Sequence, residues 1–216
     1  MSIASNIPIN ITQHYTDINV RLYGGWREGP RLTRRAQLII PQLQTHFPCT
    51  FTPTGGTRIQ LQAELAFGPL CIPNVVLNNT LAHDRPLRRF YSKQIPWSQC
   101  ANPGLCGLSP VASLQHDTPC TQNTCGMTAG DILMRSEQKM VDTCIVADIA
   151  HLAYSTQASH IVVLSSDTDM WPGVLAALAA GSQIIQIHTK RGGITQPHLV
   201  RTIPRQLVTG YTEHSI

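Results

Sequence analysis

A chain of 216 residues is the size expected of one domain with an insertion, and it can bury a substantial core. The sequence contains no leader-like apolar run and no span of about 20 apolar residues, so we expect neither secretion nor membrane insertion and predict a cytoplasmic protein. The net charge of +4 permits contact with phosphate groups but does not require it.

The first long segment without regular structure is predicted at residues 68–130. It is rich in Pro, Asn and Gly, lacks helical periodicity, and contains only short apolar runs such as Val75-Val76-Leu77. A loop of this length inside a compact domain needs some added constraint to hold it. We therefore predict a single domain over residues 1–216 that carries an inserted segment at 68–130.

Two cysteine pairs in the insertion offer such a constraint. The pairs are Cys100-x5-Cys106 and Cys120-x4-Cys125, and four thiolates can hold zinc tetrahedrally and contribute directly to folding. We predict a structural zinc site at these four residues, with His116 as a substitute ligand. Free thiols and disulfides are the alternatives, and a cytoplasmic setting disfavours the disulfides.

A helix is predicted over residues 139–153. Val141, Ile145, Ile149 and Leu152 recur at helical spacing and form one stripe that faces the core. At about 100° per residue, two acidic residues fall on opposite flanks of that stripe, so neither lies simply on the solvated back of the helix. They are Asp142 and Asp148.

A strand, an acidic turn, a helix and a second strand follow. The strands are predicted at residues 160–166 and 182–188, and the helix between them at 172–180, with Pro at its start and Gly181 behind it. Such a βαβ unit has parallel strands, which we expect to be buried on both faces. Asp167 and Asp169 then lie at the carboxyl end of the first strand, where ligands of open α/β sheets bind.

Half of the chain's twelve acidic residues lie between positions 131 and 169 although the protein is net basic. We expect Asp131 and Glu137 to be solvated carboxylates or helix caps. For Asp148 a structural role and a functional role are equally favoured. Asp167 and Asp169 are different, because two like charges at the end of a buried strand would otherwise stand unpaired. Together they predict a divalent cation site.

The other cysteines and histidines have no motif around them. We expect Cys49, Cys71 and Cys144 to be small buried hydrophobic residues, and His151, His160 and His188 to be structural or on the surface. The paired glycines of the sequence lack the spacing of a dinucleotide-binding or P-loop motif. A nucleotide hydrolase is therefore not favoured.

The acidic segment resembles a known family, the NYN domain, which is a branch of the PIN-like ribonucleases. Its pattern of K-x-V-D, a helix, S-x-D-x-D, Pro, and Gly before a strand is matched in order over about 55 residues by Lys139-Met140-Val141-Asp142, the helix with Asp148, Ser165-Ser166-Asp167-Thr168-Asp169, Pro172 and Gly181. The resemblance implies a PIN-like α/β fold with a mainly parallel sheet flanked by helices. It also implies metal-dependent RNA cleavage at Asp142, Asp167 and Asp169.

The resemblance extends more weakly to residues 18–45, where Ile18 to Trp26 is similar to the family's second strand and the turn after it. The family's first strand, which is apolar and ends in an aspartate of the metal site, has no counterpart before it. Asp17 stands at the start of its strand and not at the end. Three explanations stay open: a start that omits the strand, another chain that supplies it, or a degenerate site.

The predicted function is that of an endoribonuclease that uses Mg²⁺ or Mn²⁺ held by Asp142, Asp167 and Asp169. Asp148 is expected to assist indirectly, through contacts with the metal ligands and not with the metal. The alternative is a catalytically degenerate NYN module that binds RNA or a partner protein. A chain without its first strand is also expected to self-associate.

Two basic groups either contact RNA or form solvated surface. They are Arg31, Arg34 and Arg35, and Arg85, Arg88, Arg89 and Lys93.

Overall fold

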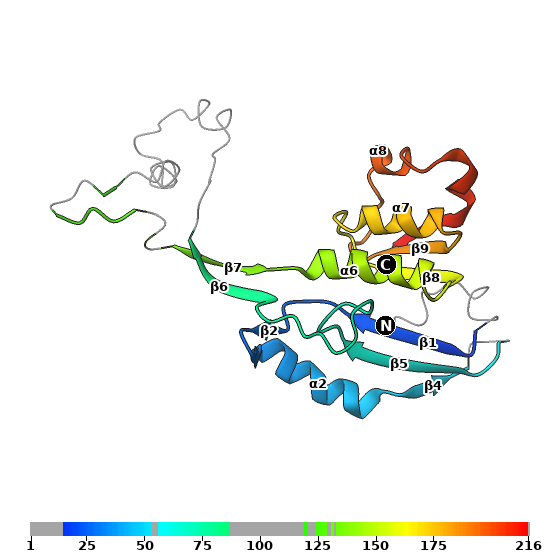
Figure 1. Ribbon diagram of the computed structural model, residues 1–216, viewed down its shortest axis with the longest axis horizontal. Helices are drawn as coiled ribbons and strands as arrows, with labels where there is room; N and C mark the ends of the chain where they lie inside the picture. The colour runs from blue at the N-terminus through cyan, green and yellow to red at the C-terminus, as the bar shows by residue number, and fades with distance from the viewer. Residues whose placement is uncertain are drawn as a thin grey trace. The chain divides into compact units, whose positions relative to one another are not determined.

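The computed structural model describes residues 15–52, 56–86, 119–120, 124–128, 131 and 133–215 (Figure 1). These residues form a mixed α/β structure, which confirms the predicted class. The chain divides into two compact units, the larger made of residues 1–80 and 139–216 and the smaller of residues 81–138. No helix in the described part of the chain is long and apolar enough to cross a membrane.

The N-terminal half of the larger unit forms a three-stranded sheet. Its order is β1 (Asp17–Leu22), β5 (Ile59–Leu65), β4 (Cys49–Phe51), with β1 parallel and β4 antiparallel to β5. Parallel neighbours need a long crossover, and here it contains the short hairpin of β2 (Arg27–Glu28) and β3 (Arg31–Leu32) and the helix α2 (Arg34–His46). Buried Trp26, Ala36 and Leu65 join α2 to this sheet.

The C-terminal half of the larger unit contains the predicted βαβ unit. The helix α6 (Val141–Tyr154) precedes a fully parallel sheet ordered β10 (Tyr211–Ser215), β9 (Gln183–His188), β8 (His160–Leu164). The helix α7 (Trp171–Ala179) connects β8 to β9, and α8 (Pro197–Val200) and the 3-10 helix η4 (Arg205–Gly210) connect β9 to β10. The predicted helices and strands of this half are thus confirmed, with ends that differ by one or two residues.

Two expectations about the sheets need correction. A mainly parallel sheet was predicted, whereas the described strands fall into four separate sheets of two or three strands, of which the first is mixed. Both strands of the βαβ unit were expected to be buried on both faces, which is confirmed for β9 beyond its first residue. It is wrong for β8, where Val162 and Leu164 are 39% and 38% exposed. Only the face with Ile161 and Val163 packs into the core with α6 and α7.

Close packing of α6 on α7 fixes the relative position of the two helices. Gly173 lies in the first turn of α7, and a Cβ atom added there would meet the Cα atom of Val146 on α6 at 3.1 Å. Any larger side chain at this position would therefore push the helices apart. Each helix begins beside an acidic residue that the sequence predicts as a metal ligand, so the spacing of the helices bears on the predicted site.

The smaller unit is described through one antiparallel pair of strands, β6 (Leu81–Pro86) and β7 (Met134–Gln138). Leu81 pairs with Gln138, and the register shifts between Ala82 and Arg85. Of the predicted zinc ligands, Cys100 and Cys106, like the substitute His116, lie outside the described residues, while Cys120 and Cys125 are exposed free thiols. The zinc site and the 68–130 boundary stay predictions.

The single cysteines differ from one another in burial. Cys144 lies on α6 and is 7% exposed, so the expectation of a small buried hydrophobic residue is confirmed there. Burial raises the pKa of its thiol to about 11, which makes it a poor nucleophile. Cys49 is partly buried. Cys71 is exposed, contrary to the expectation, because it lies on the surface loop that follows β5.

Candidate metal centre

The turn after β8 presents Asp167 and Asp169. The Asp167 N–H donates to the Ser165 hydroxyl oxygen at 3.0 Å, and the Asp169 N–H donates to Oδ1 of Asp167 at 3.1 Å. Met170, which is 2% exposed, and Trp171 then anchor the start of α7 in the core. The backbone of the turn is therefore held at both ends, and the Asp167 carboxylate is held by the Asp169 N–H.

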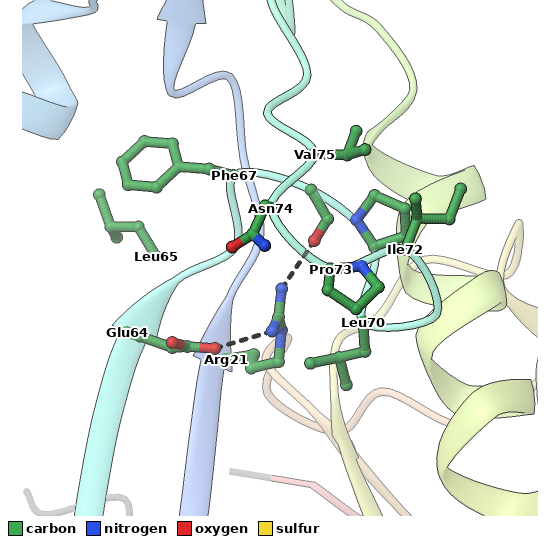
Figure 2. Close-up of a pocket in the computed structure, with 11 residues that line it drawn as sticks. Arg21, Glu64, Leu65, Phe67, Leu70, Ile72, Pro73, Asn74 and Val75 are labelled. Atoms are coloured by element: carbon green, nitrogen blue, oxygen red, sulfur yellow. Dashed lines mark hydrogen bonds and ion pairs between the residues drawn. The ribbon is translucent and has the colours of Figure 1, made fainter. Parts of the chain in front are cut away.

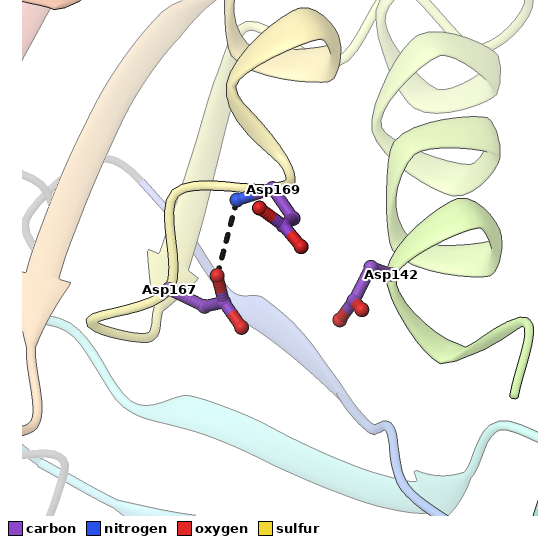
Figure 3. A group of neighbouring side chains, drawn as sticks. All are labelled: Asp142, Asp167 and Asp169. Atoms are coloured by element: carbon purple, nitrogen blue, oxygen red, sulfur yellow. Dashed lines mark hydrogen bonds between the residues drawn. The ribbon is translucent and has the colours of Figure 1, made fainter. Parts of the chain in front are cut away.

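Asp142 completes a cluster with these two residues. It lies in the first turn of α6, and Figure 3 shows its carboxylate turned toward those of Asp167 and Asp169. One ligand oxygen from each of the three residues lies within 4.8 Å of the others. Asp142 is partly buried, whereas Asp167 and Asp169 are exposed. The structure thus brings together the three acidic residues that the sequence predicts as metal ligands.

The cluster concentrates negative charge, and no cation among the described residues pairs with it. None of the ion pairs among the described residues involves Asp142, Asp167 or Asp169. Burial, together with the negative charges of Asp167 and Asp169, raises the pKa of Asp142 above its ordinary value. A cation bound among the three carboxylates would remove this repulsion.

The donors suit a hard divalent ion. Carboxylate oxygens are preferred by Mg²⁺, Mn²⁺ and Ca²⁺, whereas no cysteine or histidine belongs to this cluster of described residues. Two oxygens on opposite sides of Mg²⁺ are about 4.2 Å apart, because each Mg–O distance is about 2.1 Å. The three ligand oxygens lie within 4.8 Å of one another, so this donor set suits a single Mg²⁺ or Mn²⁺ ion.

Asp148, the fourth predicted acid, does not join the cluster. It lies six residues beyond Asp142 on α6, about 9 Å along the helix axis. Its side chain is 1% exposed, and its oxygens accept hydrogen bonds from the Tyr23 hydroxyl and the Leu70 N–H, each at 2.6 Å. The Nε atom of Arg21 lies 3.3 Å from Oδ2. Its partners are therefore all protein groups, and the structure gives it no open position for a metal.

Arg21 ties three parts of the larger unit together. Its guanidinium donates to the Glu64 carboxylate at 2.7 Å and to the Gly68 carbonyl oxygen at 2.8 Å, and Figure 2 shows Arg21 beside Glu64. The same side chain pairs with Asp148, so β1, the loop after β5 and α6 meet here beside a pocket of about 460 Å³. Sequence reasoning missed Arg21 and Tyr23 as partners of Asp148. The available signal was Asp148 itself, since a carboxylate on the flank of a buried helix face needs a cation and donors.

The structure describes only part of the two predicted basic groups. Arg31, Arg34 and Arg35 are exposed around the start of α2. Arg88, Arg89 and Lys93 lie outside the described residues, and Arg85 belongs to β6. Contact with RNA stays a prediction for both groups.

Comparisons with protein-family models, with curated proteins and with solved structures each give no match. What can be said of the function therefore comes from the residues and their arrangement.

Proposed function

We propose that the protein is a metal-dependent endoribonuclease of the NYN type, with Asp142, Asp167 and Asp169 as the ligands of Mg²⁺ or Mn²⁺. The observation that carries the proposal is the approach of these three carboxylates to within 4.8 Å without any cation among their described partners. Leaving three like charges together is costly unless an ion occupies the site. The order of the motif along the chain and its resemblance to the NYN pattern support the choice of RNA as substrate.

Each carboxylate has a role in this chemistry. Asp167 and Asp169 sit on a turn that protein hydrogen bonds fix, so they provide preset ligands, while Asp142 adds a third from a neighbouring helix. The three residues would hold a metal ion, which would lower the pKa of a bound water molecule and neutralise negative charge on the scissile phosphate. Asp148 contributes indirectly, because its bonds to Tyr23 and Leu70 hold α6 in place.

A second candidate function is a degenerate module that binds RNA or a partner protein without cleaving. The observation that favours it is that the described strands of the larger unit include two separate three-stranded sheets, one with β1 and one with β8 at its edge. The NYN pattern has a central strand that ends in an aspartate, and no strand among the described residues joins β1 to β8. The cluster of described residues correspondingly holds three carboxylates and no fourth.

The experiment that separates the two candidates is an RNA cleavage assay with Mn²⁺ on the wild type, Asp167→Asn and Asp169→Asn. Cleavage by the wild type that is lost in both variants, on the order of 100-fold or more, supports the nuclease, because a misplaced metal no longer aligns water with phosphate. Asp17→Asn is the matched control, since it makes the same change at an exposed carboxylate at the start of β1. Equal cleavage by all four proteins would show that the cluster is not the active site. RNA binding by the wild type without cleavage would favour the module.

A further inference from the structure

The loop between β9 and α8 holds two cationic residues next to the acidic turn. The Lys190 N–H donates to the hydroxyl oxygen of Ser166 at 3.0 Å, and the Ser166 and Thr189 hydroxyls lie 3.3 Å apart. Ser166 immediately precedes Asp167 in the chain. The backbone of Lys190 is therefore tied to the turn that carries two of the three carboxylates.

The same loop is tightly folded. The Gly193 N–H donates to the Lys190 carbonyl oxygen at 2.8 Å, and Gly192 has a φ angle of +65° that disfavours other residues. A Cβ atom at Gly193 would lie 2.8 Å from that carbonyl oxygen, so only glycine fits. The turn fixes the backbone of Lys190 and Arg191 at the tip of the loop and leaves their side chains exposed.

Neither side chain has a partner among the described residues, whose ion pairs and side-chain hydrogen bonds include neither the Lys190 ammonium nor the Arg191 guanidinium. They do not neutralise the cluster, although the backbone of Lys190 is tied to its turn. The loop thus places two unpaired cations next to a turn whose carboxylates have no cationic partner among the described residues, which suits a ligand that carries both a metal-binding group and further negative charge.

We propose that Lys190 and Arg191 bind the RNA phosphate next to the one at the metal, and so position the strand for cleavage. The inference rests on the proposed function and adds to it the residues that hold the substrate. Three carboxylates and one divalent ion leave a net negative site, which by itself repels the flanking phosphates of a polyanion. Cations fixed at one side of the site overcome this repulsion and select which phosphate reaches the metal.

The test is a double variant of the full chain, Lys190→Gln/Arg191→Gln, compared with the wild type and with Arg201→Gln/Arg205→Gln. The control removes the same charge from exposed positions at the end of α8 and the start of η4, outside the basic groups predicted to contact RNA. Binding to a fluorescein-labelled single-stranded RNA is measured by anisotropy in Ca²⁺ from 50 to 200 mM salt, and cleavage is measured in Mn²⁺. Mn²⁺ affinity without RNA is measured on the same proteins by calorimetry.

We expect the loop variant to raise Kd and KM for RNA about tenfold, to change kcat by less than about threefold, and to flatten the salt slope by about 0.7, which corresponds to the loss of one phosphate contact. Its Mn²⁺ affinity should be unchanged or slightly higher. Equal losses in the loop variant and in Arg201→Gln/Arg205→Gln would overturn the assignment, since they would reflect net charge alone. Unchanged KM and salt slope, in a protein whose cleavage depends on Asp167, would overturn it and leave the proposed function standing. A wild type that neither binds nor cleaves RNA would remove both.

Discussion

Two carboxylates on α6 show opposite environments within one helix. Asp148 is 1% exposed and has Tyr23, Leu70 and Arg21 as partners, whereas Asp142 is partly buried and faces two further carboxylates. A buried charge whose partners are complete contributes to the structure, and its removal leaves those partners unsatisfied. A group of charges without partners destabilises the free protein and is retained for what it binds. The comparison assigns Asp148 to the fold and Asp142 to the site.

The largest effect expected from this comparison is on stability. Asp148→Ala should lower the free energy of unfolding by about 3–5 kcal/mol, because it leaves the Arg21 guanidinium, the Tyr23 hydroxyl and the Leu70 N–H without their shared acceptor. Urea unfolding followed by circular dichroism measures it in metal-free buffer. Asp142→Asn serves as the matched control and should be neutral or stabilising. Equal losses in both variants would erase the distinction between the two carboxylates.

The sequence reaches the acidic cluster but not the network around Asp148, for a physical reason. Asp167 and Asp169 end a strand, so a local pattern and the rule for parallel sheets place them together at one edge. Asp142 follows from the resemblance to a spaced motif. The partners of Asp148, however, are 125 and 78 residues away along the chain, at Tyr23 and Leu70, and no local pattern specifies such a contact.

Strand pairing was predictable only where the chain pairs neighbours. The β8-α7-β9 unit is local, and its parallel register appears as expected. The sheet of β1, β5 and β4 depends on a crossover through α2, and its separation from β8 could not be derived from either segment alone. The exposure of Val162 and Leu164 was not predictable either, because β8 has the apolar composition of a strand covered on both faces.

A second way to sharpen the comparison is to move α6 against α7 without touching a carboxylate. Gly173→Val places a branched side chain where even a Cβ atom would be 3.1 Å from Val146, so we expect a loss of about 1–3 kcal/mol in stability. Because Asp142 and Asp169 lie at the starts of the two helices, Mn²⁺ affinity should also fall. Calorimetric titration measures it, and Ala179→Val, at an exposed position of α7, is the control for a branched side chain in this helix. Unchanged metal affinity in a folded Gly173→Val protein would show that the helix spacing does not set the site.

The smallest effect is the pH dependence that Asp142 adds to the stability of the metal-free protein. Its pKa is raised by burial and by the charges of Asp167 and Asp169, so deprotonation costs more in the folded than in the unfolded chain. The associated stability is fully present below the ordinary carboxyl pKa of about 3.9 and is lost as the pH rises through the raised value. Above that window Asp142→Asn should be more stable than the wild type by less than about 1 kcal/mol, since solvent screens the partly exposed group. Below it the difference should disappear.

Adding Mn²⁺ should reverse the order at neutral pH. A ligand that binds only the folded state stabilises it by RT ln(1 + [L]/Kd), and the wild type has one more carboxylate to hold the ion than Asp142→Asn. Thermal unfolding of both proteins, with and without Mn²⁺ at two pH values, measures the stability difference between them in each condition. A wild type that is more stable than Asp142→Asn in chelator at neutral pH would mean that Asp142, like Asp148, has protein partners that complete its charge, and the contrast between the two carboxylates would then be lost.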